Sequence, residues 1–267
     1  MTFHCRRFDY LSWTEAEKVA QAKGSTLVWP FGACEQHGPH LPLATDSIFA
    51  EKILSRALAR VPESFPLWML PSQLMGFSPE HASFPGTISL SSNLLTSLVI
   101  EVGSQAASMG FQRLLLFNAH GGQIGLLQAA ARELRKDCPL MAVLPCFLWR
   151  GVSSLENLIP VKEIESGLHA GLAETSLMLA LSSHLVGKER PVDGEHFECD
   201  SPSTPPKGWS LEGASPFAWL TKDLSDSGVI GDSRDSTPLL GETIEEALVT
   251  HWVDQFVSLM NSNWPPV

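Results

Sequence analysis

The segment from Trp29 to Asp46, WPFGACEQHGPHLPLATD, concentrates side chains that can bind a metal ion. It contains Glu35, His37 and Asp46, and imidazole nitrogen together with carboxylate oxygen is a ligand set that borderline divalent ions select. The segment is rich in turn-forming residues and follows an apolar run, which is where α/β enzymes place catalytic groups. We therefore predict a metal-dependent hydrolase whose remaining ligands come from elsewhere in the chain.

Two later segments supply candidate ligands of the same types. His120 lies in the turn NAHGG after the apolar run RLLLF, and Glu174 lies one helical turn beyond the pair His169–Ala170. Because the loops that follow parallel strands gather at one edge of a sheet, we expect these side chains to meet the first segment there. Two histidines and three carboxylates would hold one or two divalent ions, and Asp46 could bridge two ions through its two oxygens.

Such a centre predicts a hydrolytic mechanism. A divalent ion lowers the pKa of a bound water and polarises a substrate carbonyl, so that water becomes the nucleophile. A nearby histidine that does not bind metal can carry a proton to the leaving nitrogen, and His169 is the candidate for this role.

Strand-like and helix-like segments alternate along the chain. We expect strands over 25–31, 67–71, 113–117 and 139–148, and helices over 46–61, 94–109, a segment through 133–135, 170–185 and 244–260. This order predicts an α/β fold with a mostly parallel sheet covered on both faces, in a single domain of residues 1–267. Thr45 or Asp46 is expected to cap the helix that follows the ligand segment. The Ser/Pro/Gly-rich stretch 186–227 is expected to be irregular.

Composition and charge exclude several classes of partner. The net charge of −11 argues against nucleic acid or an anionic membrane surface, since both attract basic proteins. No apolar run approaches the ~20 residues of a membrane span, and the N-terminus lacks the pattern of a secretory signal. The five cysteines are scattered and never spaced as CxxC, which is typical of reduced thiols in a cytoplasmic protein.

Four sequence blocks, GACEQHGPHLPLATD, EHASFPGT, NAHGGQ and HAGLAETSLMLAL, together resemble the creatininase (creatinine amidohydrolase) family. They occur in the family's order between residues 27 and 181, and SGVIGD around residues 228–232 resembles its C-terminal segment. The resemblance implies a three-layer α/β/α sandwich, usually a homohexamer, with a mono- or dinuclear site for zinc, manganese or iron. It also implies hydrolysis of a non-peptide C–N bond in a cyclic or linear amide.

The resemblance also assigns roles to particular residues. The residues that match the family's metal-ligand positions are Glu35, His37, Asp46, His120 and, as in members whose histidine turn reads HGGN, Glu174. His169 matches the catalytic histidine. Two positions depart from true creatininases, which have glutamate where this chain has Gly122 and Leu168.

These departures place the sequence closer to the HGG branch of the family. That branch includes deformylases of pyrimidine intermediates in flavin and deazaflavin synthesis, and peptide-trimming enzymes of redox-cofactor maturation. We therefore expect a small-molecule amide or formamide substrate other than creatinine. The loss of glutamate at positions 122 and 168 also keeps open a second reading, a non-catalytic metal-binding or assembly protein that retains the fold.

Other residues near the predicted site keep alternative interpretations. His40 is expected to have a structural role or to support a ligand. Glu80 and His81 could line the substrate pocket, form a subunit contact or serve packing. Trp149 and Trp219 could wall an apolar pocket or belong to the core. The histidines without a cluster around them, expected at the surface, are His184, His196 and His251.

Overall fold

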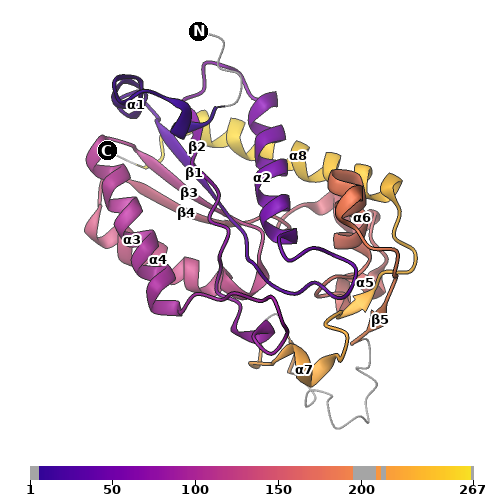
Figure 1. The fold of residues 1–267 in the computed structure, drawn as a ribbon. Coiled ribbons are helices and arrows are strands. Elements are labelled where there is room, and N and C mark those ends of the chain that lie inside the picture. The colour runs from indigo at the N-terminus through magenta and orange to yellow at the C-terminus, as the bar shows by residue number, and fades with distance from the viewer. Residues whose placement is uncertain (1–5, 195–208, 212–214, 266–267) are drawn as a thin grey trace.

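The centre of the molecule is a sheet of four parallel strands (Figure 1). The computed structural model describes residues 6–194, 209–211 and 215–265. In order across the sheet, the strands are β2 (Leu67–Met69), β1 (Thr26–Phe31), β3 (Arg113–Asn118) and β4 (Ala142–Phe147). Phe31 pairs with Asn118, and Asn118 pairs with Phe147, so these three strands end at the same edge. The loops after β1 and β3 therefore emerge side by side.

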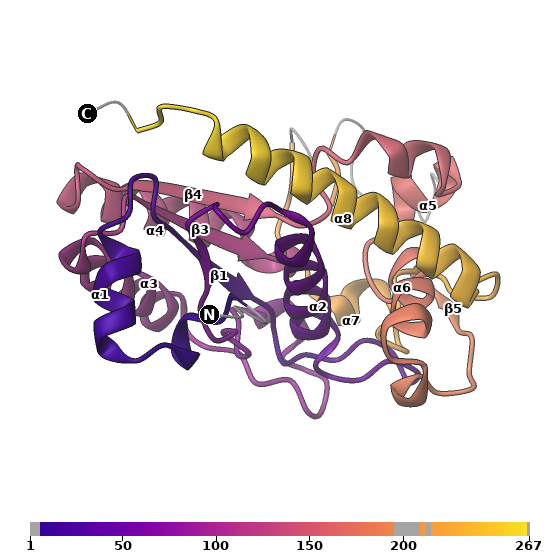
Figure 2. The same ribbon diagram turned by 90° about the horizontal axis from the view of Figure 1, so that it is seen from above.

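Helices cover both faces of the sheet (Figure 2). One face carries α3 (Ser92–Met109) and α4 (Ile124–Asp137), and the other carries α2 (Thr45–Arg60) and α8 (Pro238–Met260). Helix α6 (Leu172–Ser182) packs against α8 and α2 beyond the carboxyl ends of the strands (Figure 2). The shorter elements are α1 (Trp13–Ala20), α5 (Val161–Ser166), α7 (Thr221–Leu224) and the antiparallel pair of β5 (Val192–Asp193) and β6 (Gly231–Asp232). The predicted three-layer α/β/α sandwich with a mostly parallel central sheet is confirmed.

Alternate residues of the central strands point into two separate cores. Leu115 and Phe117 of β3 pack with the layer of α2, α6 and α8, whereas Leu114 and Leu116 pack with the layer of α3 and α4. All four side chains are buried. A strand covered on both faces favours apolar residues at successive positions, which explains the run LLLF that follows Arg113.

The start of α2 differs from the prediction. Its N-cap is Ala44, and neither Thr45 nor Asp46 caps it, because both already have other neighbours. The Thr45 hydroxyl donates to the Pro42 carbonyl at 2.7 Å, and the Asp46 carboxylate faces histidines. The capping prediction was therefore wrong, although Asp46 does lie in the first turn, at the positive end of the helix dipole.

The stretch predicted to be irregular contains two short elements in its described part, β5 and α7. Residues 195–208 and 212–214 of that stretch, which include His196 and Cys199, lie outside the described residues, as does Cys5. Cys34, Cys138 and Cys146 are free thiols. Over the described ranges, the protein has no helix with both the length and the apolar character needed to cross a membrane.

Candidate metal site and catalytic pocket

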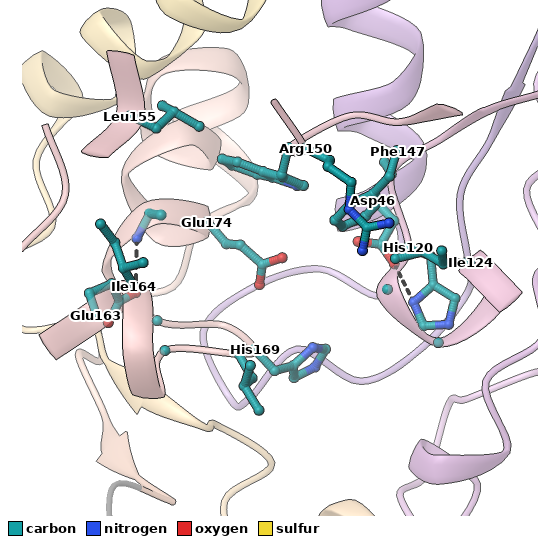
Figure 3. A pocket seen from close by; sticks show the side chains of 18 of the residues that line it. Asp46, His120, Ile124, Phe147, Arg150, Leu155, Glu163, Ile164, His169 and Glu174 are labelled. Atoms are coloured by element: carbon teal, nitrogen blue, oxygen red, sulfur yellow. Dashed lines mark hydrogen bonds and ion pairs between the residues drawn. The ribbon is translucent and has the colours of Figure 1, made fainter. Parts of the chain in front are cut away.

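The predicted site residues come from four separate segments that meet at the carboxyl edge of the sheet. Glu35 and His37 lie in the loop after β1, Asp46 in the first turn of α2, and His120 in the turn after β3. From the other side, His169 lies just before α6 and Glu174 in its first turn. Figure 3 shows Asp46 and His120 on one side of the cavity, with His169 and Glu174 opposite them.

Asp46 lies between two imidazoles. Its Oδ1 is 3.4 Å from His37 Nε2, and its Oδ2 is 3.4 Å from His120 Nδ1. His120 Nδ1 is also 3.2 Å from Glu35 Oε1. Each Asp46 oxygen therefore faces a different histidine, which is the arrangement that lets one carboxylate bridge two ions. With Glu174, His37 and Asp46 form a group whose ligand atoms all lie within 4.8 Å of one another.

The donor atoms of this cluster fit a divalent ion. Among the described residues, buried atoms without a hydrogen-bond partner include Glu35 Oε2, His37 Nε2 and Asp46 Oδ2. An unpaired buried polar atom costs roughly 1–3 kcal/mol, so proteins seldom leave several of them together. Oxygen and imidazole nitrogen are also the ligand types that zinc, manganese and iron accept.

Backbone carbonyls orient the histidines toward the cluster. His37 Nδ1 lies 3.2 Å from the Glu35 carbonyl, and His120 Nε2 lies 3.0 Å from the Phe77 carbonyl. A carbonyl only accepts, so each of these nitrogens donates its hydrogen. In the neutral rings the lone pairs of His37 Nε2 and His120 Nδ1 then face the carboxylates, as in metal sites whose ligand histidines are held by a second hydrogen bond.

The crowding of charges shifts several pKa values. Burial alone would lower the pKa of His37, but Asp46, Glu174 and Glu35 outweigh it and raise that pKa to about 9. Burial likewise opposes the charged form of His120, yet Glu35 and Asp46 raise its pKa well above the ordinary value. Burial, with Asp46 and Glu35 nearby, raises the pKa of Glu174 to about 7. The site therefore concentrates negative charge that a cation would balance.

His169 lies between two other histidines. Its ring centroid is 4.2 Å from that of His37 and 4.2 Å from that of His81. Its Nε2 donates to the Gln36 carbonyl at 2.7 Å, so Nδ1 carries the lone pair, 3.9 Å from Glu35 Oε1. Burial and the neighbouring His37 and His81 hold the pKa of His169 well below its usual value. The ring is therefore neutral and can accept a proton at Nδ1.

The loop that carries His169 is held at both ends. The His169 backbone exchanges two hydrogen bonds with Ile230, of 3.0 and 2.8 Å. Ala170 adopts the left-handed conformation, with φ of 55°, and its amide donates to Glu174 Oε2 at 2.6 Å. A Cβ added at Gly171 would lie 2.5 Å from Glu163 Oε1, so this loop packs directly on α5.

The structure shows where the residues lie whose role the sequence left open. Glu80 and His81, in the short 3₁₀ helix Pro79–His81, both line the cavity. His81 Nε2 lies 3.5 Å from Glu35 Oε1. His40 is bound through Nε2 to the Thr175 hydroxyl at 2.8 Å, which agrees with a structural role. Sequence reasoning left Glu80 and His81 undecided, although the block EHASFPGT already marked their loop.

The two other histidines in the described part of the chain, His184 and His251, lie outside the cluster. His184 is exposed as expected. His251 is half-buried, with its ring edge-on to Trp252 at 5.5 Å between centroids. Neither residue lines the cavity.

A cavity of about 540 Å³ opens onto the cluster. Phe147, Trp149 and Leu155 form part of an apolar wall, and Trp149 also packs edge-on against Phe49 at 5.8 Å between ring centroids. Trp219 lies near His81, so both tryptophans considered from the sequence line this cavity. Of the described lining residues, Arg150 alone is a lysine or arginine.

A three-layer α/β fold with a buried histidine–carboxylate cluster at the carboxyl edge of its sheet is the architecture of a metal-dependent hydrolase. The family model described as creatininase, creatinine amidohydrolase, matches residues 9–256. The chain belongs to the creatininase family, as the sequence blocks predicted.

Two relatives and one solved structure show how broad this likeness is. A mycofactocin precursor peptide peptidase of Mycobacterium tuberculosis (strain ATCC 25618 / H37Rv) is 32% identical over 238 residues, covering 84% of this chain and 81% of the relative. A creatinine amidohydrolase of Pseudomonas putida is 30% identical over 197 residues, covering 68% and 74%. A solved creatininase named as the Mn form superposes with a TM-score of 0.74 at 25% identity, covering 95% of this chain and 98% of that one.

Proposed function

We propose that this protein is a metal-dependent amidohydrolase that cleaves an amide C–N bond with water as the nucleophile. The residues that would hold one or two divalent ions are Glu35, His37, Asp46, His120 and Glu174. The observation that carries the proposal is the group of buried donor atoms without partners at the cavity, together with histidine lone pairs oriented toward them. Solved creatininases in Mn and Zn forms support zinc or manganese as the ion, and iron remains a candidate.

The protein's own residues would then position the reactants and move protons. When bound, a divalent ion lowers the pKa of water and polarises an amide carbonyl. His169 would receive a proton at Nδ1 and deliver it to the leaving nitrogen. Its hydrogen bond to the Gln36 carbonyl keeps Nε2 protonated, so the proton can be exchanged only on the side that faces Glu35.

The substrate is a small amide or formamide, or the end of a peptide. A cavity of about 540 Å³ suits a ligand of this size. Two features favour the peptide as a second candidate: relatives named as precursor peptide peptidases, and Arg150, whose guanidinium matches a terminal carboxylate. A non-peptide cyclic or linear amide stays the prediction from the sequence blocks, and the two classes separate in a direct substrate screen.

Metal analysis combined with turnover tests this function. Protein purified without chelator is expected to hold at least one divalent ion per chain, and His37→Ala and Asp46→Asn are expected to lose it. Formamides, cyclic amides and short peptides would be screened with manganese, zinc and iron. Turnover that His169→Ala abolishes, while the metal content stays unchanged, supports the proposal.

The matched control is His184→Ala, because His184 is exposed and distant from the cluster. Its metal content and turnover should equal those of the wild type. Metal-free wild-type protein would overturn the metal site. Bound metal with no turnover of any substrate class would instead favour the non-catalytic binding or assembly protein.

The predicted homohexamer and the cytoplasmic location come from the sequence and stay predictions. Size-exclusion chromatography with light scattering would measure the mass of the assembly. A mass other than six chains would contradict the hexamer without affecting the proposed site.

A further inference from the structure

Glu80 lies beside the proposed ligands without being one of them. Its Oε1 is 3.4 Å from His120 Nε2 and 4.0 Å from His81 Nε2, and its side chain is only 12% exposed. With Glu35 and His120 it forms a group whose ligand atoms all lie within 4.8 Å of one another. Glu80 therefore belongs geometrically to the cluster, although it comes from a different loop.

Gly122 makes room for this carboxylate. A Cβ built at Gly122 would lie 1.9 Å from Glu80 Oε1 and 2.7 Å from His120 Nε2. A side chain at position 122 and the observed Glu80 conformation therefore exclude each other. The carboxylate reaches His120 from the loop after β2, across the space that the missing side chain leaves open.

The Glu80 carboxylate needs a positive partner. Within the described part of the chain, its ion-pair partners are the imidazoles of His81 and His120, and neither lysine nor arginine contacts it. Enclosing a carboxylate in this way is costly unless a cation or strong hydrogen bonds compensate.

Orienting His120 does not require Glu80. His120 Nε2 already has the Phe77 carbonyl at 3.0 Å and the Ser78 hydroxyl at 3.3 Å. These partners fix the ring and its tautomer, leaving Nδ1 free toward Glu35. Because the Phe77 carbonyl already orients the His120 ring, orienting that ring does not explain why the Glu80 carboxylate lies here.

We propose that Glu80 is a further metal ligand, bound to the same ion as Glu35 and His120. The inference rests on the proposed metal site and extends its ligand set. Glu35 Oε2, which is buried and has no hydrogen-bond partner, supports an ion at this position. Gly122 and Glu80 then form a matched pair, in which the small residue is required so that the acidic one can reach the ion.

Metal affinity of Glu80→Gln tests this assignment directly. The substitution keeps the shape and removes the charge. Metal-free wild type and variant would be titrated with Mn²⁺ by calorimetry, and their Co²⁺ forms compared by visible absorption. For a direct ligand, one binding step should weaken by more than about 100-fold, because outer partners typically cost 10–100-fold. The Co²⁺ spectrum should also change.

A reciprocal transfer tests the pairing of positions 80 and 122. In Glu80→Ala/Gly122→Glu, the new carboxylate enters the space that Glu80 vacates, and Mn²⁺ affinity should recover relative to Glu80→Ala alone. Gly122→Glu by itself should weaken binding, because its side chain collides with Glu80. Glu156→Gln is the control, since Glu156 lines the cavity but is exposed and outside the cluster.

The outcomes separate this inference from the proposed function. Suppose that the wild type binds Mn²⁺, that Glu80→Gln weakens this binding by no more than about 100-fold, and that the Co²⁺ spectrum is unchanged. Glu80 is then not a ligand, while the proposed metal site stands. If the wild type itself binds no divalent ion, the proposed function fails.

Discussion

Three histidines of the site are oriented by the same kind of hydrogen bond. In each of them, one ring nitrogen donates a hydrogen bond to a backbone carbonyl, and the other nitrogen faces the carboxylates. The three residues are His37, His120 and His169. The carbonyls thus determine which ring nitrogen keeps its hydrogen when the ring is neutral and the other nitrogen is free to bind a ligand. Rings held in this way pay little conformational entropy when a ligand binds, because their orientation is already fixed.

Metal binding should release protons near neutral pH. The pKa of His37 is raised to about 9, so in the metal-free protein its Nε2 holds a proton that an ion must displace. Affinity for Mn²⁺ is therefore expected to rise as pH increases from 6 toward 9 and to fall as pH decreases. Calorimetry at pH 7 in buffers of different ionisation enthalpy would measure the released protons. An observed enthalpy that is independent of the buffer would contradict this.

The sequence predicted most residues of the candidate site because they lie in recognisable places. Glu35, His37 and His120 directly follow apolar strands, so the shared edge of a parallel sheet brings them together. Glu80 and His81 could not be placed in the same way, since they lie well beyond the short strand β2. Only the path of that loop, which depends on contacts such as Thr221 with the Glu80 carbonyl, carries them to the site.

At the level of elements, apolar periodicity predicted the four strands of the central sheet and the long helices, but it missed the short elements α1, α5, α7, β5 and β6. Among the elements that were predicted, the errors occur at the ends. The expected helix over 170–185 begins at Leu172, because Ala170 is held in the left-handed conformation by the loop. The last helix begins at Pro238, before its apolar repeat, because Thr237 caps it. Tertiary contacts fix such ends, and a periodic pattern does not contain them.

The packing of α6 against α8 depends on a glycine. A Cβ at Gly241 would lie 1.8 Å from the Ser176 carbonyl oxygen, which is backbone and cannot move aside. Gly241→Ala is expected to lower the free energy of unfolding by about 1–3 kcal/mol, although alanine favours helix by about 1 kcal/mol. Denaturant unfolding followed by circular dichroism would measure the change.

Gly125→Ala is the matched control for this prediction. Gly125 lies in α4, is exposed, and has no atom within 4 Å of an added Cβ. Its substitution should be neutral or stabilise by up to about 1 kcal/mol. Equal effects of the two substitutions would show that helix propensity, and not the α6–α8 contact, decides the result.

For the molecule as a whole, the proposed site joins separate layers and loops. Its ligands belong to the loops after β1 and β3 and to α2 and α6, on one side of the sheet and at its edge. A bound ion should therefore stabilise the entire fold and not one loop.

Removal of metal should lower the melting temperature. An ion that binds only the folded chain adds about 2.7 kcal/mol when its free concentration is a hundred times Kd. Scanning fluorimetry with chelator and then with added Mn²⁺ is expected to show a reversible loss and gain of stability. Asp46→Asn should show little response to either, and a full response in that variant would contradict the proposed ligand set.

The pairing of His169 with Ile230 has a consequence for the protein during its synthesis. Hydrogen bonds from a residue far along the chain hold the backbone of the proposed catalytic histidine. A nascent chain that has emerged from the ribosome only as far as α6 already contains the proposed metal ligands, yet it lacks Ile230, which pairs with His169, and α8, which packs against α6 and α2. The assembled site, and with it proton transfer by His169, is therefore expected only after the C-terminal segment has been synthesised.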